Sequence, residues 1–308
     1  LVGSEMCIRD RLWYAKQELA GTPEANLPIL SAAAPFKAGT RGDATAYTDI
    51  PAGPIAIKNV ADLYLYDNVT AILKVNGAQL KEWLEMSAGQ FNTIDPNNNQ
   101  PQNLVNTDYR TYNFDVIDGV TYEFDITQPN KYDREGKLAN PNASRVRNLK
   151  YQGKEIDPNQ EFIVVTNNYR SNGNFPGVRE ASLNRLLNLE NRQAIINYIL
   201  EEKNINPSAD GNWRFTSSIK DADVRFLTAD KAKDLVGKDG DVVYLEPSKQ
   251  EGFGEYRFVY VEPKVQPETK PEEPTRPETG NPSFVFVPNH QKPAQDETIT
   301  LSHSQQTI

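Results

Sequence analysis

Two tyrosines, each beside asparagine side chains, have the chemistry needed to hold a flat heterocyclic ring. Tyr66 lies in the segment Asp62–Asn68, and Tyr169 lies far downstream in the segment Thr166–Arg170. Each of these tyrosine segments follows a predicted strand. An aromatic ring stacks on a nucleobase, and a neighbouring amide can hydrogen-bond the edge of that base. Two such segments, if they face each other, would form a clamp for a nucleobase.

The asparagines beside the two rings are candidates for recognising the edge of the ligand. Asn68 offers both a hydrogen-bond donor and an acceptor, but it could equally make the turn after Asp67. Asn167 and Asn168 have the same ambiguity, because either could brace the segment that presents Tyr169. The tyrosines also have a structural alternative, since many half-buried tyrosines simply close loops.

Lys37 is the main candidate for holding an anion. It follows the small residues Ala32–Ala34 and precedes Ala38-Gly39. Small residues let backbone N–H groups approach an anion closely, and lysine supplies a compact positive charge. A solvated surface lysine is the competing interpretation. Arg41 and Arg170 are weaker candidates of the same kind.

No group of residues in the sequence has the spacing of a catalytic or metal site. Asp115 and Asp118 lie close together, but Gly119 favours a turn, so we assign no catalysis to them. The two histidines, His290 and His303, lie near the C-terminal end and form no cluster with the rest. Phosphate-binding glycine loops, zinc-binding cysteine pairs and nucleophile-elbow motifs are also absent. We therefore predict no metal ligand and no catalytic residue in this chain.

The composition describes an ordinary globular chain with an acidic balance. Its 308 residues are enough for one large or two small domains, and the formal net charge is −9. This charge argues against a nucleic-acid polymer as partner, whereas a small nucleotide needs only one or two local cations. No apolar stretch reaches the roughly 18 residues of a membrane span. The only cysteine, Cys7, excludes disulfides within the chain.

Hydrophobic periodicity predicts a mixture of strands and helices around the two tyrosine segments. Strands are predicted over residues 29–34, 70–75, 120–126, 146–151, 161–166, 213–215 and 256–261. Helices are predicted over residues 12–19, 79–88 and 192–202, the last with a buried stripe of Ile195, Ile196, Ile199 and Leu200. Asn76-Gly77 predicts a tight turn. Because strands and helices do not alternate strictly, the predicted fold class is α+β.

Composition also divides the chain into three parts. Residues 1–11 look unrelated to the rest of the chain, and we interpret them as foreign sequence at a broken gene end, with the front of the protein lost. Residues 12–262 form the folded domain. From 263 to 308 proline recurs among glutamate, lysine and threonine, which predicts an extended Pro/Glu-rich linker and tail. Residues 283–308 are either an incomplete second module or a disordered tail.

Further segments accompany the two tyrosine segments in a fixed order. They are Ser31–Gly39, Tyr47–Pro54, Gly77–Glu85 and Phe114–Tyr122. Together these segments closely resemble the C-terminal domain of the bacterial bifunctional 2′,3′-cyclic-nucleotide 2′-phosphodiesterase/3′-nucleotidases, within the wider 5′-nucleotidase family. The resemblance is collinear from about Trp13 to about Val261, and it implies a layered α/β/β/α domain.

The resemblance also implies roles for the candidate site residues. In the 5′-nucleotidase family two aromatic residues sandwich the base, and these match Tyr66, just before Asn68, and Tyr169, ahead of a Gly-containing turn. The loop that matches Lys37 carries a basic residue that helps to hold phosphate or ribose. Relatives in the 5′-nucleotidase branch have arginine in Gly-rich sequence there, and this chain departs from that pattern.

Finally, the resemblance implies an activity that this chain does not hold by itself. Members of the family hydrolyse phosphoesters with divalent metal ions held in an N-terminal metallophosphatase domain, which is missing here. We therefore expect a nucleotide-binding specificity domain for small nucleotides and nucleosides, inactive alone, from an exported (periplasmic, extracellular or cell-wall associated) protein. The main alternative is a stand-alone secreted nucleoside- or nucleotide-binding module without catalysis. A cell-surface structural domain without a ligand is a third possibility.

Overall fold

A five-stranded sheet carries the site in the computed structural model, which describes residues 2–35, 37–39, 42–206, 209–237, 240–263 and 298–301. The strand order is β10–β3–β9–β1–β5, and the β1–β9 pair is parallel whereas its other pairs are antiparallel. The strands are β1 (Ile29–Ala33), β3 (Val69–Asn76), β5 (Val116–Asp118), β9 (Glu161–Asn167) and β10 (Leu183–Glu190). Strand β9 is buried from its second residue to its last, as expected for a strand covered on both faces.

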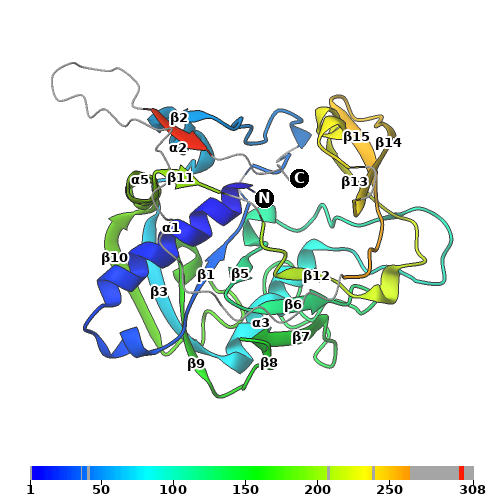
Figure 1. The fold of residues 1–308 in the computed structure, drawn as a ribbon. Helices are drawn as coiled ribbons and strands as arrows, with labels where there is room; N and C mark the ends of the chain where they lie inside the picture. Colours follow the sequence, from blue (N-terminus) through cyan, green and yellow to red (C-terminus); the bar gives the residue numbers. More distant parts are fainter. Residues whose placement is uncertain are drawn as a thin grey trace.

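Helix α1 (Val2–Leu19) lies across one face of this sheet and packs on β1 (Figure 1). At its end, Leu19 joins Ile163 of β9 in an apolar cluster. The helix predicted over residues 12–19 is confirmed. The structure extends this helix back into the segment 1–11, whose foreign origin stays a prediction.

Helix α5 (Asn191–Glu202) packs beside α1 on the same side of the domain. Ile195 and Ile199 are buried, as their spacing predicts. Ile196 is partly buried and packs against the same cluster, whereas Leu200 is 38% exposed, so the predicted stripe is wrong at Leu200. The reason is that α5 packs mainly against α1, and Leu200 faces solvent.

Helix α3 (Gly77–Ser87) lies between the first sheet and a second, four-stranded sheet, and it contacts β3 and β7. The second sheet has the order β12–β6–β7–β8. Its strands are β6 (Thr121–Phe124), β7 (Val146–Tyr151), β8 (Lys154–Glu155) and β12 (Trp213–Phe215). Leu80, Trp83 and Leu84 of α3 are fully buried in the main core. The α+β fold class is therefore confirmed.

The Asn76-Gly77 pair starts helix α3, so the tight turn predicted there is wrong. The Asn76 side chain accepts a hydrogen bond from the Gln79 backbone N–H at 2.8 Å, and the Gln79 side chain accepts one from the Asn76 N–H at 2.9 Å. This reciprocal capping satisfies donors that have no partner within the helix. A side chain at Gly77 would meet the Asp157 carbonyl oxygen at 2.2 Å. Glycine is needed here because the backbones approach so closely.

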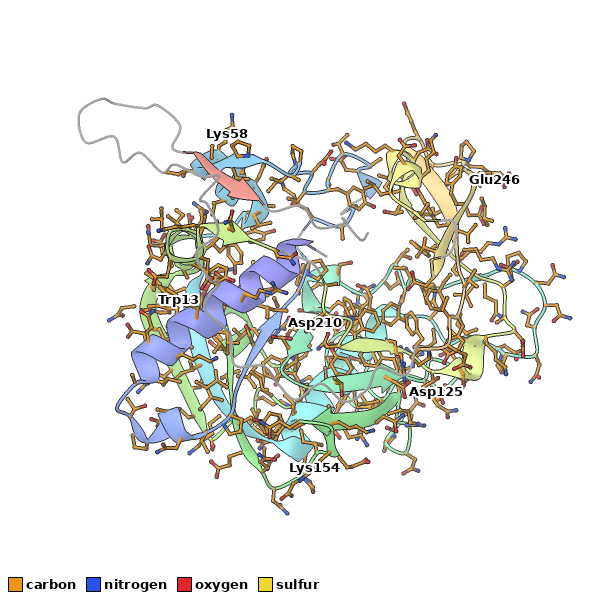
Figure 2. The ribbon with its side chains drawn as sticks, in the orientation of Figure 1. Trp13, Lys58, Asp125, Lys154, Asp210 and Glu246 are labelled. Atoms are coloured by element: carbon orange, nitrogen blue, oxygen red, sulfur yellow. The ribbon has the colours of Figure 1, made fainter. Side chains whose placement is uncertain are left out.

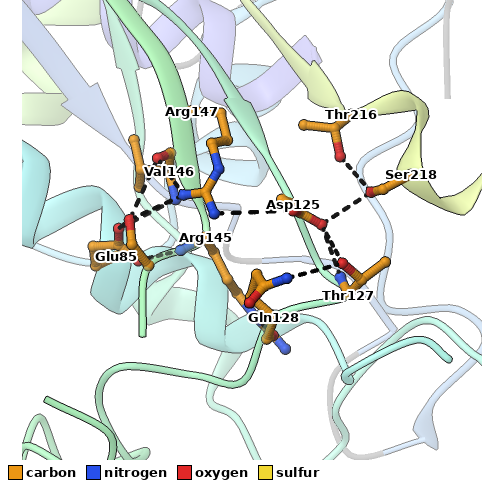
Figure 3. Close-up of polar contacts among 10 residues, drawn as sticks. Glu85, Asp125, Thr127, Gln128, Arg145, Val146, Arg147, Thr216 and Ser218 are labelled. Carbon is orange, nitrogen blue, oxygen red and sulfur yellow. Dashed lines mark hydrogen bonds and ion pairs between the residues drawn. The ribbon is translucent and has the colours of Figure 1, made fainter. Parts of the chain in front are cut away.

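A buried polar network fastens α3 to the second sheet (Figure 3). The Glu85 carboxylate accepts hydrogen bonds from the Ser144 hydroxyl at 2.6 Å and from the Arg145 N–H at 2.9 Å. The Arg145 guanidinium donates to the carbonyls of Ala88, Phe91 and Gln128 at 2.7 to 2.8 Å. Burial lowers the pKa of Arg145 to about 10, so the side chain stays protonated at neutral pH. This charge therefore binds together three segments of backbone.

Two smaller sheets complete the described part of the chain. One has the order β14–β15–β13–β4 and lies to one side of the domain in Figure 1. Its strands are β4 (Gln102–Asn103), β13 (Val224–Ala229), β14 (Val242–Pro247) and β15 (Phe253–Phe258). The other sheet has the order β11–β16–β2, with β2 (Pro54–Ala56), β11 (Asn204–Ile205) and β16 (Thr298–Leu301). Strand β15 corresponds to the strand predicted over residues 256–261, but it begins and ends three residues earlier in the chain.

Two short helices, α2 (Ile57–Leu63) and α4 (Asn168–Ser171), overlap the two tyrosine segments. Figure 2 shows Lys58 of α2 and Lys154 of β8 at opposite ends of the domain.

Within the described ranges, no helix is both long and apolar enough to cross a membrane. Of the tail predicted over 263–308, residues 264–297 and 302–308 lie outside the described residues, as do Arg41, His290 and His303.

Candidate functional site

The two tyrosine segments line one cavity of about 270 Å³ at the end of β1 and β9. Strand β1 and the residue after it supply a wall of small side chains, Ala32–Ala34. The loop before β5 contributes a further side. The full lining is Arg11, Ala32, Ala33, Ala34, Tyr66, Asn68, Tyr112, Asp115, Thr166, Asn167, Tyr169 and Arg170. Tyr66, Asn68 and Tyr169 from the predicted site therefore meet at one place.

The first tyrosine segment, Asp62–Asn68, begins in the last turn of helix α2 and does not follow a strand, so that part of the prediction is wrong. Tyr64 within it is completely buried, and its hydroxyl lies at hydrogen-bond distance from four donors. They are Arg11 Nη2 at 3.1 Å, Asn68 Nδ2 at 3.2 Å, Asn167 Nδ2 at 3.1 Å and Asn191 Nδ2 at 2.9 Å. This one oxygen connects both tyrosine segments and the start of α5.

The second tyrosine segment, Thr166–Arg170, runs from the end of β9 into α4, as the predicted strand requires. Asn167 caps α4, because its Oδ1 accepts a hydrogen bond from the Arg170 N–H at 2.8 Å. Asn168 Oδ1 accepts one from the Val69 N–H at 2.9 Å. Both asparagines thus brace the segment, and Asn168 is not among the described residues that line the cavity.

The two predicted clamp rings are unusually accessible for tyrosines. Tyr66 is 51% exposed and Tyr169 is 57% exposed, although both line the cavity. Tyr112 meets Tyr169 edge to face, with ring centroids 5.9 Å apart and an interplanar angle of 87°. Burial and the neighbouring Tyr112 raise the pKa of Tyr169, so its hydroxyl stays protonated at neutral pH. Accessible aromatic faces beside small apolar residues suit the stacking of a flat ring.

Of the three predicted cations, Arg41 lies outside the described residues, Arg170 lines the cavity and Lys37 does not. Lys37 Nζ forms an ion pair with Asp62 Oδ1 at 3.0 Å and is not part of the described cavity lining. Arg170 does line the cavity, but its Nε donates to Asp115 Oδ2 at 2.6 Å in a buried ion pair. Its guanidinium also lies 3.9 Å from the ring centroid of Phe175. Arg170 is therefore already neutralised by a neighbour.

Sequence reasoning missed four residues at the site: Arg11, Tyr112 and Asp115, which line the cavity, and Tyr64, which is buried behind it. Asp115, to which only a turn was assigned, is 4% exposed and lines the cavity. Its Oδ2 accepts hydrogen bonds from Trp83 Nε1 and from Arg170 Nε. Each role depends on contacts between segments far apart in the chain, and no local pattern signals them.

Metal binding finds no support among the residues that the structure describes. Within those ranges no group of three or more histidine, cysteine, aspartate or glutamate residues could hold a metal ion. What the cavity offers is stacking surfaces, amide and carboxylate oxygens, and small apolar side chains.

The fold and the cavity agree with a comparison against known families. Residues 31–177 match the family model described as the 5′-nucleotidase C-terminal domain. This range includes both tyrosine segments and every lining residue of the cavity except Arg11. Residues 31–177 therefore belong to the family of 5′-nucleotidase C-terminal domains.

Individual proteins with similar sequences or structures show what kind of enzyme carries this domain. The chain is 50% identical over 250 residues to the trifunctional nucleotide phosphoesterase YfkN of Bacillus subtilis, covering 80% of this chain and 17% of that protein. It is 48% identical over 246 residues to the 2′,3′-cyclic-nucleotide 2′-phosphodiesterase/3′-nucleotidase of Haemophilus influenzae, covering 76% of this chain and 37% of that protein. A 5′-nucleotidase precursor from Thermus thermophilus shares the fold, with a TM-score of 0.50, 16% identity, and coverage of 70% of this chain and 35% of that one. The homologues are thus nucleotide phosphoesterases, and this chain spans well under half of their length.

Proposed function

We propose that this chain is the nucleotide-specificity domain of a metal-dependent 2′,3′-cyclic-nucleotide phosphodiesterase and 3′-nucleotidase. The observation that carries the proposal is the pair of exposed rings, Tyr66 and Tyr169, in one cavity. Base stacking on such rings contributes roughly 1–3 kcal/mol per base and accepts any base. The names of the relatives support a nucleotide ligand.

In this proposal, the chain's own residues bind and orient the nucleotide. The base lies between Tyr66 and Tyr169, and the Ala32–Ala34 wall excludes water from its side. Asn68 donates its Nδ2 hydrogen to Tyr64 at 3.2 Å, which leaves Oδ1 to accept a hydrogen bond from a base amino group. Held in this way, the phosphoester is presented in one orientation.

The hydrolytic step belongs to a separate metallophosphatase domain in this proposal. Divalent metal ions held there would polarise the phosphate and activate the attacking water. The specificity domain adds no catalytic group, and Lys37 is paired with Asp62 outside the described cavity lining. We further propose that the whole protein is exported, which the near-absence of cysteine from this chain suits.

Alanine substitution of each ring tests the clamp. We expect Tyr66→Ala and Tyr169→Ala each to weaken binding of adenosine or 3′-AMP by roughly 1–3 kcal/mol, about fivefold to a hundredfold in Kd. Phenylalanine at either position should keep most of the affinity, because it keeps the stacking face. Isothermal titration of the 308-residue chain measures these changes.

The control is Tyr260→Ala, at a half-buried tyrosine outside the cavity lining. It should bind like the parent chain. The two clamp substitutions should also be non-additive, because a base released on one face is held less firmly on the other. A folded Tyr66→Ala or Tyr169→Ala chain with parental affinity would show that the ring in question is structural only.

A further inference from the structure

One oxygen of Asp115 has no partner in the described structure. Asp115 Oδ2 accepts hydrogen bonds from Trp83 Nε1 at 2.8 Å and from Arg170 Nε at 2.6 Å. Oδ1 accepts none from the described residues, and it is not among the fully buried polar atoms that lack a partner. Since Asp115 is 4% exposed and lines the cavity, this accessible oxygen faces the cavity.

The surroundings of Asp115 fix the direction of this oxygen. Trp83 is completely buried in α3, so its indole N–H cannot move away from Oδ2. Arg170 is held on its other side by the Tyr112 carbonyl at 3.0 Å and by the ring of Phe175. The carboxylate therefore presents Oδ1 to the cavity as a preorganised acceptor. Because this acceptor is held in one direction, a ligand that places a donor against it gains a hydrogen bond without having to order the side chain.

The chemistry of the oxygen limits what it can recognise. An ionised carboxylate accepts hydrogen bonds and donates none, so its partner must be an O–H or N–H group. Because Asp115 already pairs with Arg170, a cationic ligand group is not required to balance its charge. Tyr112 and Tyr169 line the cavity beside Asp115. In the proposed function a base stacks on Tyr169, so the sugar attached to that base lies next to Asp115. A sugar hydroxyl is the donor that fits.

We infer that Asp115 Oδ1 accepts a hydrogen bond from the 5′-hydroxyl of the bound nucleotide. This inference rests on the proposed function, because it uses the substrates named there. A 2′,3′-cyclic nucleotide has both its 2′ and 3′ oxygens esterified, and a 3′-nucleotide has its 3′ oxygen esterified. The 5′-hydroxyl is therefore the only sugar hydroxyl that the two substrates share, and one fixed acceptor can serve both.

The same contact disfavours nucleotides that carry a 5′-phosphate. A 5′-phosphate in this position would bring negative charge against the Asp115 carboxylate and would remove the donor hydrogen. Like charges placed together discriminate strongly against the wrong ligand. Asp115 is thus a specificity-determining residue that favours nucleotides with a free 5′ end.

The test combines Asp115→Asn with adenosine analogues in isothermal titrations of the full chain. Asparagine keeps one oxygen for Trp83 and Arg170 but places an NH₂ group where Oδ1 was. We expect the parent chain to bind adenosine about tenfold to a hundredfold more tightly than 5′-deoxyadenosine, and Asp115→Asn to bind the two alike. The preference of the parent for adenosine over 5′-AMP should also shrink in the variant. Asp118→Asn, outside the cavity lining, is the matched control.

Each outcome separates the inference from the proposed function. A parent chain that binds neither adenosine nor 3′-AMP contradicts the proposed function itself. A parent that binds adenosine and 5′-deoxyadenosine equally well overturns the role of the 5′-hydroxyl, and this result needs no variant to fold. If discrimination is lost in Asp115→Asn for 2′-deoxyadenosine or for purine riboside instead, the acceptor serves another group and the 5′ assignment is wrong.

Discussion

At the residue scale, the hydroxyl of Tyr64 lies within hydrogen-bond distance of amides from both tyrosine segments and from α5. Asn191, one of these amides, also accepts a hydrogen bond from the Thr70 hydroxyl at 2.7 Å. The rings that we propose for base binding are therefore positioned by a residue that is itself hidden from the ligand. The geometry of the clamp depends on hydrogen bonds behind it.

Removing the Tyr64 hydroxyl should loosen this arrangement. Tyr64→Phe keeps the buried ring but leaves the amides of Asn167 and Asn191 without their acceptor. An unsatisfied buried polar group costs about 1–3 kcal/mol, so we expect a loss of stability of this size and weaker adenosine binding. Urea denaturation followed by circular dichroism measures the first effect, and titration measures the second. Tyr66→Phe is the matched control and should change stability little, since that ring is 51% exposed.

Local chemistry predicts some of these residues and not others. Tyr66, Asn68 and Tyr169 are recognisable because each combines an exposed type of side chain with a distinctive neighbourhood in the sequence. Tyr64 and Asp115 act through partners far away in the chain, such as Asn167 and Trp83. Such roles exist only once the sheet has brought the segments together, so the sequence alone could not assign them.

At the scale of elements, the fold depends on a charge in its interior. Arg145 is completely buried between α3, the loop that comes after it and β7, and it supplies hydrogen bonds to three carbonyls. Arg147, two residues later on β7, has a side chain that is 40% exposed and lies 4.0 Å from Asp125. The two arginines offer a direct comparison between a buried and a surface cation.

We expect Arg145→Leu to destabilise the chain by about 3–5 kcal/mol, because the Glu85 carboxylate loses a nearby positive charge and three carbonyls lose their donor. Arg147→Leu should cost less than about 1 kcal/mol, as is usual for exposed ion pairs. Thermal unfolding of the two variants and the parent measures the difference. Equal thermal unfolding midpoints for all three chains would show that the buried hydrogen bonds of Arg145 do not stabilise the fold.

The prediction of elements succeeded where strands are apolar throughout. The runs at 29–34, 70–75 and 161–166 correspond to β1, β3 and β9, which are buried in the central sheet. Strand β10 was not predicted, because its sequence Leu-Asn-Arg-Leu-Leu-Asn-Leu-Glu leaves most positions exposed at the sheet edge. Its pairing with β3 comes from backbone hydrogen bonds, which leave no signature in side-chain polarity.

At the scale of the whole molecule, the position of the segment 1–11 can be tested by its one thiol. Cys7 is 2% exposed in the structure and packs with Ile8 and Ile199. Burial raises the pKa of the Cys7 thiol to about 12, well above the pKa of a free thiol, so little reactive thiolate forms near pH 8. If the segment is packed as described, its cysteine is chemically protected.

We expect the native chain to react slowly with a thiol reagent at pH 8 and immediately once it is unfolded in guanidinium. The pKa of this thiol is higher when folded, so stability should fall as pH rises above about 9 and the unfolded thiol ionises. Fast labelling of a natively folded chain would show that residues 1–11 do not pack on the domain. That result would support their foreign origin.

The parallel pairing of β1 with β9 also has a consequence for how the protein is made. Leu30 lies opposite Val164, so β1 leaves the ribosome long before its central neighbour has been synthesised. Contacts between such distant residues form slowly, because closing the intervening chain costs conformational entropy. In the meantime the apolar edge of β1 is open to other nascent chains. Ribosome-bound intermediates that stop short of β9 are therefore the form of this protein most dependent on chaperones.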